Sequence, residues 1–371
     1  MLEIQKEIKE FGLDAVVSKY SFSVDQQGDL IMLGYNMIES DRYAEAVREC
    51  RGIILNKDTF EVVSYPFRRF FNQGEGPADS FPVATGRLEE KRDGSIISVY
   101  LDPSTGGLCI STRGRILADG NVRGSSKTFN ELVRETLWKY PRAESYMMNG
   151  LINGIKTFIF ELTGPENQVC TPYPESELCL LGARFEDLDE VDCYVLDTFA
   201  RDMGVLRPKV YPFNNESDIE RIMSELKDIE EGFVLVSDRK INGSFLRIKI
   251  KNPRYLAISK MVHAGTGSFM SPKYILDVIR QGDSDEILTY FPEFTDVFRS
   301  MENKYKALVL EIQTVFENLR AKNLDTKGFA SEALNYPYHG LLFGLNNGKI
   351  KTVQDGLCNI AIDKLIVILG L

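Results

Sequence analysis

The segment Lys91-Arg92-Asp93-Gly94 combines a potential nucleophile with a turn. A lysine amine attacks phosphorus only in its unprotonated form, which burial and neighbouring cations favour. The apolar run at residues 95–100 is typical of a buried strand, so the lysine should lie where a strand meets a tight turn. Taken alone, the four residues favour a surface lysine beside an Asp-Gly turn. Their chemistry therefore depends on the other polar residues of the chain.

Further charged residues fall at the ends of expected strands. Glu161 ends a strand at residues 157–162, and Glu231 precedes a strand at 233–236. Arg51 lies in an expected strand that ends at residue 55, and Arg69 precedes Phe70-Phe71. A nucleoside triphosphate needs several cations, a carboxylate for a metal or the ribose, and a nucleophile if it is to be transferred. The chain contains neither a Walker A sequence nor a glycine-rich dinucleotide fingerprint that would compete for this role.

The strand expected at residues 245–251 alternates apolar and basic side chains. Because successive side chains of a strand point to opposite faces, Arg247, Lys249 and Lys251 share one face. Cations spaced about 7 Å apart along that face repel one another unless an anion lies among them. Two interpretations stay open, an anion site and a solvated edge strand whose cations oppose aggregation.

Composition restricts the class of protein. The 371 residues are 43% hydrophobic and 26% charged, as in ordinary soluble globular proteins, and no apolar run is long enough to span a membrane. The net charge of −10 argues against indiscriminate coating of nucleic acid, yet residues 239–260 contain several cations and no acid. The six cysteines show no C-x-x-C spacing, which favours reduced thiols in a cytosolic protein. The two histidines argue against a zinc site or a histidine-based triad.

The pattern predicts an α+β fold in two parts. Alternating strands dominate the first part, and helical periodicity replaces them from about residue 260 onward. Within the first part we expect a helix at residues 217–229, with Ser217 and Glu220 as a capping box.

These residues resemble the motifs of covalent nucleotidyltransferases, a group of ATP-dependent ligases and mRNA capping guanylyltransferases. Lys91-Arg92-Asp93-Gly94, Glu161, Glu231-Gly232-Phe233-Val234 and Lys249-Ile250-Lys251 stand in the order of those motifs. The closer resemblance is to the RNA ligase 1 family, typified by the tRNA-repair ligase of T-even phages. It rests on the helical C-terminal part and on Glu49-Cys50-Arg51-Gly52-Ile53, Phe70-Phe71-Asn72 and Ser95.

The resemblance implies an antiparallel-sheet nucleotidyltransferase (adenylation) domain at residues 1–255 and an all-α domain at 256–371 with a role in RNA specificity. It implies an ATP-dependent RNA ligase that joins RNA 5′-phosphate and 3′-hydroxyl ends, in RNA or tRNA repair. The intermediates would be lysyl-AMP and an RNA 5′ end capped with AMP. The implied partner is RNA, with tRNA as one candidate. No association with a membrane is expected. We expect a monomer in the cytoplasm, or in the host-cell cytoplasm if a phage encodes the protein.

The resemblance also implies the roles of individual residues. Lys91 would be the nucleophile. Glu231 and Asp285 would support binding of Mg²⁺, for which Mn²⁺ is a possible substitute, and Tyr255 is a further candidate for an essential residue. The implied ATP site consists of Tyr35, Arg51, Arg69, Glu161, Glu231, Lys249 and Lys251, with the two arginines on the phosphates.

Two positions depart from the family, and two alternatives to an RNA ligase stay open. Arg69 stands where lysine is usual, and Arg113 stands where lysine is common, which leaves the role of Arg113 undefined. A DNA ligase or capping-type nucleotidyltransferase is disfavoured by the missing barrel domain and by Ser95 in place of an arginine. A non-enzymatic nucleotide- or RNA-binding protein is disfavoured by the intact lysine and acids.

Overall fold

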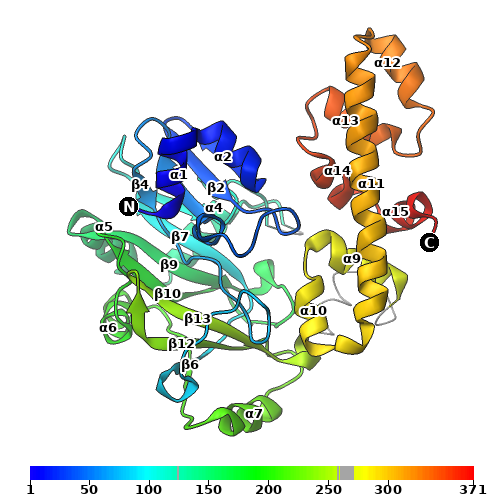
Figure 1. The fold of residues 1–371 in the computed structure, drawn as a ribbon. Coiled ribbons are helices and arrows are strands. Elements are labelled where there is room, and N and C mark those ends of the chain that lie inside the picture. The colour runs from blue at the N-terminus through cyan, green and yellow to red at the C-terminus, as the bar shows by residue number, and fades with distance from the viewer. Residues whose placement is uncertain (123–124, 257–258, 260–270) are drawn as a thin grey trace. The chain divides into compact units, whose positions relative to one another are not determined.

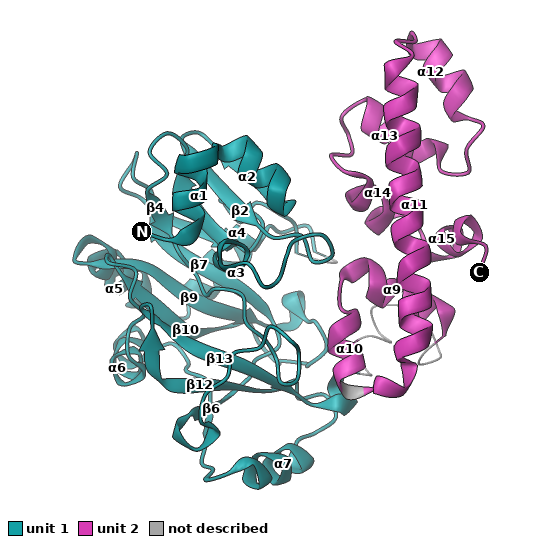
Figure 2. Ribbon diagram, in the orientation of Figure 1, with its two compact units in different colours: residues 1–256 teal, residues 257–371 magenta. Residues whose placement is uncertain are grey.

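The computed structural model describes residues 1–122, 125–256, 259 and 271–371. The chain divides into two compact units, Met1–Leu256 and Ala257–Leu371 (Figures 1 and 2). The assigned strands all lie in the first unit, and the assigned elements of the second unit are helices. The predicted α+β class with a helical C-terminal part is therefore confirmed.

The N-terminal sheet carries Arg51. Its strand order is β1-β2-β3-β4, formed by Ser23–Gln27, Leu30–Gly34, Arg51–Asn56 and Val62–Ser64, and all its pairs are antiparallel. The helices α1 (Glu3–Phe11) and α2 (Leu13–Tyr20) contribute Ile4, Ile8 and Val16 to a core shared with β3. Glu49, at the end of α3 (Glu45–Glu49), accepts hydrogen bonds from the first amides of α1, Glu3 N at 3.1 Å and Ile4 N at 2.8 Å. The acid that precedes Arg51 therefore anchors the N-terminal helix.

Two further sheets meet at Lys91. The order of one is β10-β9-β7-β8, formed by Glu177–Phe185, Ile155–Thr163, Ser95–Leu101 and Leu108–Thr112. The order of the other is β11-β6-β12-β13-β5, formed by Val210–Tyr211, Arg87–Glu90, Gly232–Ile241, Ser244–Lys251 and Phe71–Asn72. Their pairs are antiparallel except for β13 with β5. Lys91 follows the last residue of β6 in one sheet and precedes β7 in the other, so it lies at the transition between them.

Helices cover these two sheets. The largest core cluster packs residues of β7, β8, β9 and β10 against α4 (Phe129–Leu137), α5 (Ala143–Ile152) and α6 (Cys193–Met203). The other sheet buries Leu88, Phe233 and Leu235 against α7 (Glu216–Glu225). The same cluster includes Leu226, which follows α7 with an extended backbone.

The predicted bounds of one helix and one interpretation of the basic strand were wrong. The helix α7 begins at Glu216, one residue before the predicted start, because Asn215 rather than Ser217 is the N-cap. The Asn215 side chain accepts a hydrogen bond from Asp218 N at 3.0 Å. It ends at Glu225, because Leu226 leaves helical geometry. The strand β13 is no solvated edge strand, since it pairs with β12 and, at Ile248 and Lys249, with β5.

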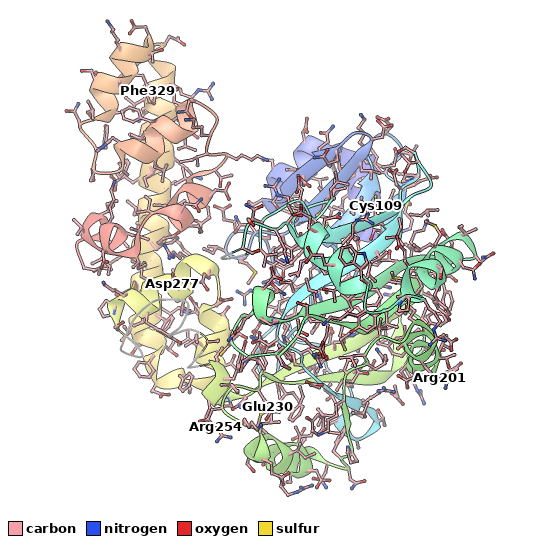
Figure 3. All side chains as sticks on the ribbon, turned by 180° about the vertical axis from the view of Figure 1, so that it is seen from behind. Cys109, Arg201, Glu230, Arg254, Asp277 and Phe329 are labelled. Carbon is pink, nitrogen blue, oxygen red and sulfur yellow. The ribbon has the colours of Figure 1, made fainter. Side chains whose placement is uncertain are left out.

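The second unit is helical around one long helix, α11 (Thr295–Ala321). This helix buries Phe298, Tyr305 and Ile312, and Phe329 is also buried (Figure 3). Asp277, 2% exposed, forms an ion pair of 2.6 Å with Arg280. Besides α11 the α-helices assigned among the described residues of this unit are α9 (Pro272–Gln281), α10 (Ser284–Tyr290), α12 (Thr326–Ala333), α13 (His339–Asn346), α14 (Val353–Asn359) and α15 (Ile362–Leu369). In neither unit do the described residues contain a helix long and apolar enough to cross a membrane.

Candidate active site at the β6–β7 turn

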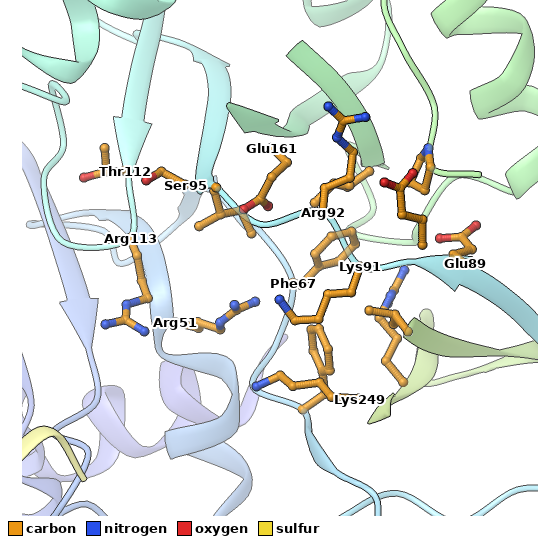
Figure 4. A pocket seen from close by; sticks show the side chains of 18 of the residues that line it. Arg51, Phe67, Glu89, Lys91, Arg92, Ser95, Thr112, Arg113, Glu161 and Lys249 are labelled. Carbon is orange, nitrogen blue, oxygen red and sulfur yellow. The ribbon is translucent and has the colours of Figure 1, made fainter. Parts of the chain in front are cut away.

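A cavity of about 580 Å³ opens beside Lys91 (Figure 4). This volume lies within the range of small-molecule sites. Side chains from all three sheets line the cavity, and the nitrogens of Arg51, Lys91 and Lys249 lie around one shared space in Figure 4. The polar lining residues that the sequence predicted are Arg51, Lys91, Glu161, Lys249 and Lys251.

Lys91 and Glu231 form the central ion pair. The Lys91 Nζ atom lies 2.6 Å from Glu231 Oε2, and Lys251 Nζ lies 3.4 Å from Glu231 Oε1. The Lys91 amide donates to the Gly232 carbonyl at 2.9 Å, which fixes the backbone on both sides of the pair. Gly232 has a φ of 128°, and a Cβ atom there would overlap the backbone of β13. The fold therefore holds the Glu231 carboxylate in an ion pair with Lys91, the candidate nucleophile.

Asp93 has a structural role that the sequence did not reveal. Its side chain is only 4% exposed and accepts hydrogen bonds from the amides of Cys170 at 2.9 Å and Thr171 at 2.7 Å. Its own amide donates to the hydroxyl of Tyr173 at 3.1 Å. Tyr255 is also hydrogen-bonded to Asp93, and burial together with the carboxylates of Glu231 and Asp93 raises its pKa well above the ordinary range. Asp93 therefore holds the turn beside Lys91 in place.

The residues around Asp93 complete the turn. A Cβ atom at Gly94 would overlap the carbonyl of Leu162, so the approach of this turn to β9 requires glycine. Ser95 Oγ donates to Asn167 Oδ1 at 3.0 Å. Arg92 forms an ion pair with Glu177 at 2.7 Å. Ser95 and Arg92 thus serve the geometry of the loop.

Two arginines pack against aromatic rings, Arg69, which is buried, and Arg51, which is partly exposed. The Arg69 guanidinium stacks 4.0 Å from the centre of the Tyr35 ring, and Arg51 lies 5.3 Å from that of Phe70. The Nη1 atoms of both arginines are buried and have no hydrogen-bond partner within the described part of the chain. Burial lowers the pKa of both guanidinium groups, because the charge has lost water. Such donors indicate that an anion completes the site.

Tyr35 reports the strength of this positive field. Burial alone would raise the pKa of its hydroxyl, but neighbouring cations more than offset that effect and lower the pKa to about 8. Those cations are Arg113, Arg51, Arg69 and Lys249. Arg113, whose role the sequence left open, thus belongs to the same cluster.

Glu161 carries the opposite perturbation. It lies on β9, and burial raises its pKa to about 7, although Lys91 and Arg51 act to lower it. The neighbouring Glu231 raises it further. A hydrogen-bond donor or a cation next to Glu161 would therefore stabilise the charged form of this carboxylate.

The cations of β13 are partly neutralised by the protein itself. Arg247 forms two hydrogen bonds with Glu190, of 2.9 Å and 2.5 Å, and Lys251 pairs with Glu231. Glu190 also pairs with the fully buried Arg184 at 3.2 Å. The repulsion expected along this face is thus relieved by Glu231, which the sequence pattern indicated, and by Glu190, which it did not. The cations that follow β13 up to residue 260 lie partly outside the described residues.

The carboxylates fit a magnesium site that is shared with a phosphate ligand. No cluster of three or more potential metal ligands occurs among the described side chains. Mg²⁺ is usually held by one or two carboxylates together with substrate phosphates and water. Glu161 and Glu231 repel each other, and a cation near them would relieve that repulsion. Asp285 lies in the second unit and pairs with Arg299 at 2.6 Å.

Comparison with known proteins gives the class of this chain. A family model described as RNA ligase matches residues 49–255, more than half of the chain. The chain therefore belongs to this RNA ligase family, and the predicted resemblance is confirmed.

The individual relatives share 30% or less of their aligned residues with this chain. The "Putative bifunctional polynucleotide kinase/RNA ligase" of Autographa californica nuclear polyhedrosis virus is 30% identical over 81% of this chain, which spans only 43% of that protein. The RNA ligase of Rhodothermus phage RM378 is 25% identical, over 88% of this chain and 87% of that protein. Among solved structures, an archaeal ATP-dependent RNA ligase is 13% identical, with a TM-score of 0.49, over 86% of this chain and 83% of that one.

Proposed function

We propose that the protein is an ATP-dependent RNA ligase that works through a covalent lysyl-AMP intermediate. The observation that carries the proposal is the position of Lys91 in a cavity that Arg51 also lines, because the buried Nη1 atom of Arg51 has no hydrogen-bond partner among the described residues. A nucleophile surrounded by cations fits the α-phosphate of a nucleotide. Membership of the RNA ligase family supports RNA as the polynucleotide.

In the first step Lys91 Nζ attacks the α-phosphorus of ATP. A nitrogen–phosphorus bond forms, the bond from the α-phosphorus to the bridging oxygen breaks, and pyrophosphate leaves. Glu231 lies 2.6 Å from the attacking nitrogen and accepts its proton. Arg51, Arg69 and Lys249 bind the phosphate oxygens. When bound, Mg²⁺ would neutralise charge at the phosphates, and Glu231 and Glu161 would help to hold it.

The next two steps consume the adduct. An oxygen of the RNA 5′-phosphate attacks the phosphorus of lysyl-AMP, forms a pyrophosphate-linked RNA 5′ end and frees Lys91. The RNA 3′-hydroxyl then attacks the 5′-phosphate, and AMP leaves. In this proposal Glu161 contacts the ribose, Tyr35 lies at the phosphates, and Lys251 binds the α-phosphate. Tyr255 positions the turn through Asp93.

The proposal assigns a separate role to each of the two units. Residues 1–255 would form the adenylation domain, and the helical residues 256–371 would contribute to RNA specificity. Asp285 would support metal binding from the second unit. RNA or tRNA repair in the cytoplasm, by a monomer, is the setting that we propose for this activity.

The substrate assay compares two polynucleotides. The protein is incubated with ATP and Mg²⁺ and either a 5′-phosphorylated single-stranded RNA or a nicked DNA duplex. Circularisation of the RNA is expected, and sealing of the DNA alone would contradict the proposal. Covalent label from α-labelled GTP but not from ATP would instead indicate a capping-type enzyme. Lys249→Ala, which leaves the core untouched, should lose adduct formation while the protein stays folded.

A further inference from the structure

A second cavity adjoins the one that contains Lys91. It has a volume of about 400 Å³ and shares Glu89, Leu181 and Arg247 with the first cavity. Its remaining wall comes from β6, β12 and β13, from the start of α6 and the two residues before it, from Thr85 before β6, and from Arg207. Apolar side chains dominate the interior, namely Val191, Leu196, Val236 and Phe245. An engineered apolar cavity of about 150 Å³ is known to accept benzene, so the second cavity has ample room for an aromatic ring.

The charges of the first cavity orient a nucleotide within it, and this step rests on the proposed function. The cations Arg51, Arg113 and Lys249 mark the phosphate end. The other lining residues include Leu181, Pro208 and Val234, whose apolar surfaces suit a flat base. Because Leu181 also lines the second cavity, the base end of the nucleotide faces the shared wall.

The polar side chains of the shared wall are held by their neighbours. Glu89 lies 2.9 Å from Arg87 and 3.7 Å from Arg207, and Arg247 is held by Glu190. The Glu89 carboxylate is an acceptor that suits an amino group on the edge of a base. Glu89 thus lies at the junction where a substituent on that amino group would leave the first cavity.

We propose that the second cavity is a subsite for an apolar substituent on the base of the nucleotide. The ligand class is an adenosine triphosphate that carries an arylmethyl group on its exocyclic amine. The phosphates and the attacked phosphorus keep the same positions as in ATP, and the aryl ring replaces water in the apolar cavity. The protein therefore uses a nucleotide that most ATP sites with a closed base pocket exclude.

The test measures formation of the lysine adduct from ATP and from N6-benzyl-ATP. We expect the wild-type protein to use both, with efficiencies that differ by less than roughly tenfold. Cys193→Phe changes a residue that lines only the second cavity, and it should abolish use of the benzyl analogue while use of ATP is unchanged. Thr85→Trp fills the same cavity from another wall and should have the same effect. Cys358→Phe, in the second unit, is the matched control that keeps both activities.

Two results would overturn the subsite. One is a wild-type protein that uses ATP but rejects N6-benzyl-ATP by more than roughly tenfold. The other is a pair of cavity-filling variants that lose ATP and the analogue equally. A wild-type protein that forms no adduct with ATP itself would refute the proposed function instead, and the subsite with it.

Discussion

Replacement of Glu161 by glutamine should stabilise the ligand-free protein in a way that depends on pH. The unfolded chain ionises this carboxyl near pH 4.5, whereas in the folded protein its pKa is about 7, because burial disfavours the charge. Between these values the folded state binds more protons, so stability falls as the pH rises. At about 1.4 kcal/mol per pH unit, the loss comes to about 3 kcal/mol above pH 7. Glu161→Gln removes the ionisable carboxyl, and with it this loss of stability at high pH.

The assay is urea unfolding of the wild-type protein and the variant at pH 5.5 and pH 8. The variant should gain about 2 kcal/mol relative to the wild type between these two pH values, as the Glu161 carboxyl of the wild type ionises. Glu144→Gln, on the exposed surface of α5, is the control and should show no such gain. The same Glu161→Gln variant should form the lysine adduct poorly, a conflict between stability and activity. If the free energy of unfolding differs between variant and wild type by the same amount at pH 5.5 and at pH 8, the reasoning is refuted.

Three further changes test the parts that position the site. Gly94→Ala should prevent adduct formation and lower the thermal midpoint, because its Cβ overlaps the Leu162 carbonyl, whereas Gly340→Ala, with open space around it, should do neither. Glu190→Ala leaves two buried arginines unpaired and should cost about 3–5 kcal/mol in urea unfolding, and a cost below about 1 kcal/mol would contradict this. Asp93→Asn should slow adduct formation without weakening ATP binding, as measured by calorimetry, and a selective loss of binding would count against a positioning role.

Much of the candidate site was predictable because its residues are close to strands. Lys91, Glu161 and Lys249 are placed by strand ends and by alternation, both of which follow from period-two patterning. The sequence also predicted the change from strands to helices, since the two periodicities differ. The comparison with known proteins confirmed the family that these motifs indicated.

What the sequence missed depends on contacts between distant segments. Asp93 receives its donors from Cys170 and Thr171, and the partner of Arg247 is Glu190. Nothing in the local pattern of either segment shows that the fold brings them together. The end of α7 was missed for a different reason, because apolar spacing continues through Leu226 after the helical backbone has stopped.

The central claim is that Lys91 becomes covalently linked to AMP, and peptide mapping by mass spectrometry tests it most directly. The protein is incubated with ATP and Mg²⁺, digested, and searched for peptides that carry AMP. The account predicts AMP on the peptide that contains Lys91, and no adduct in Lys91→Ala under the same conditions. AMP on another residue, or undiminished labelling of the Lys91→Ala variant, would contradict it.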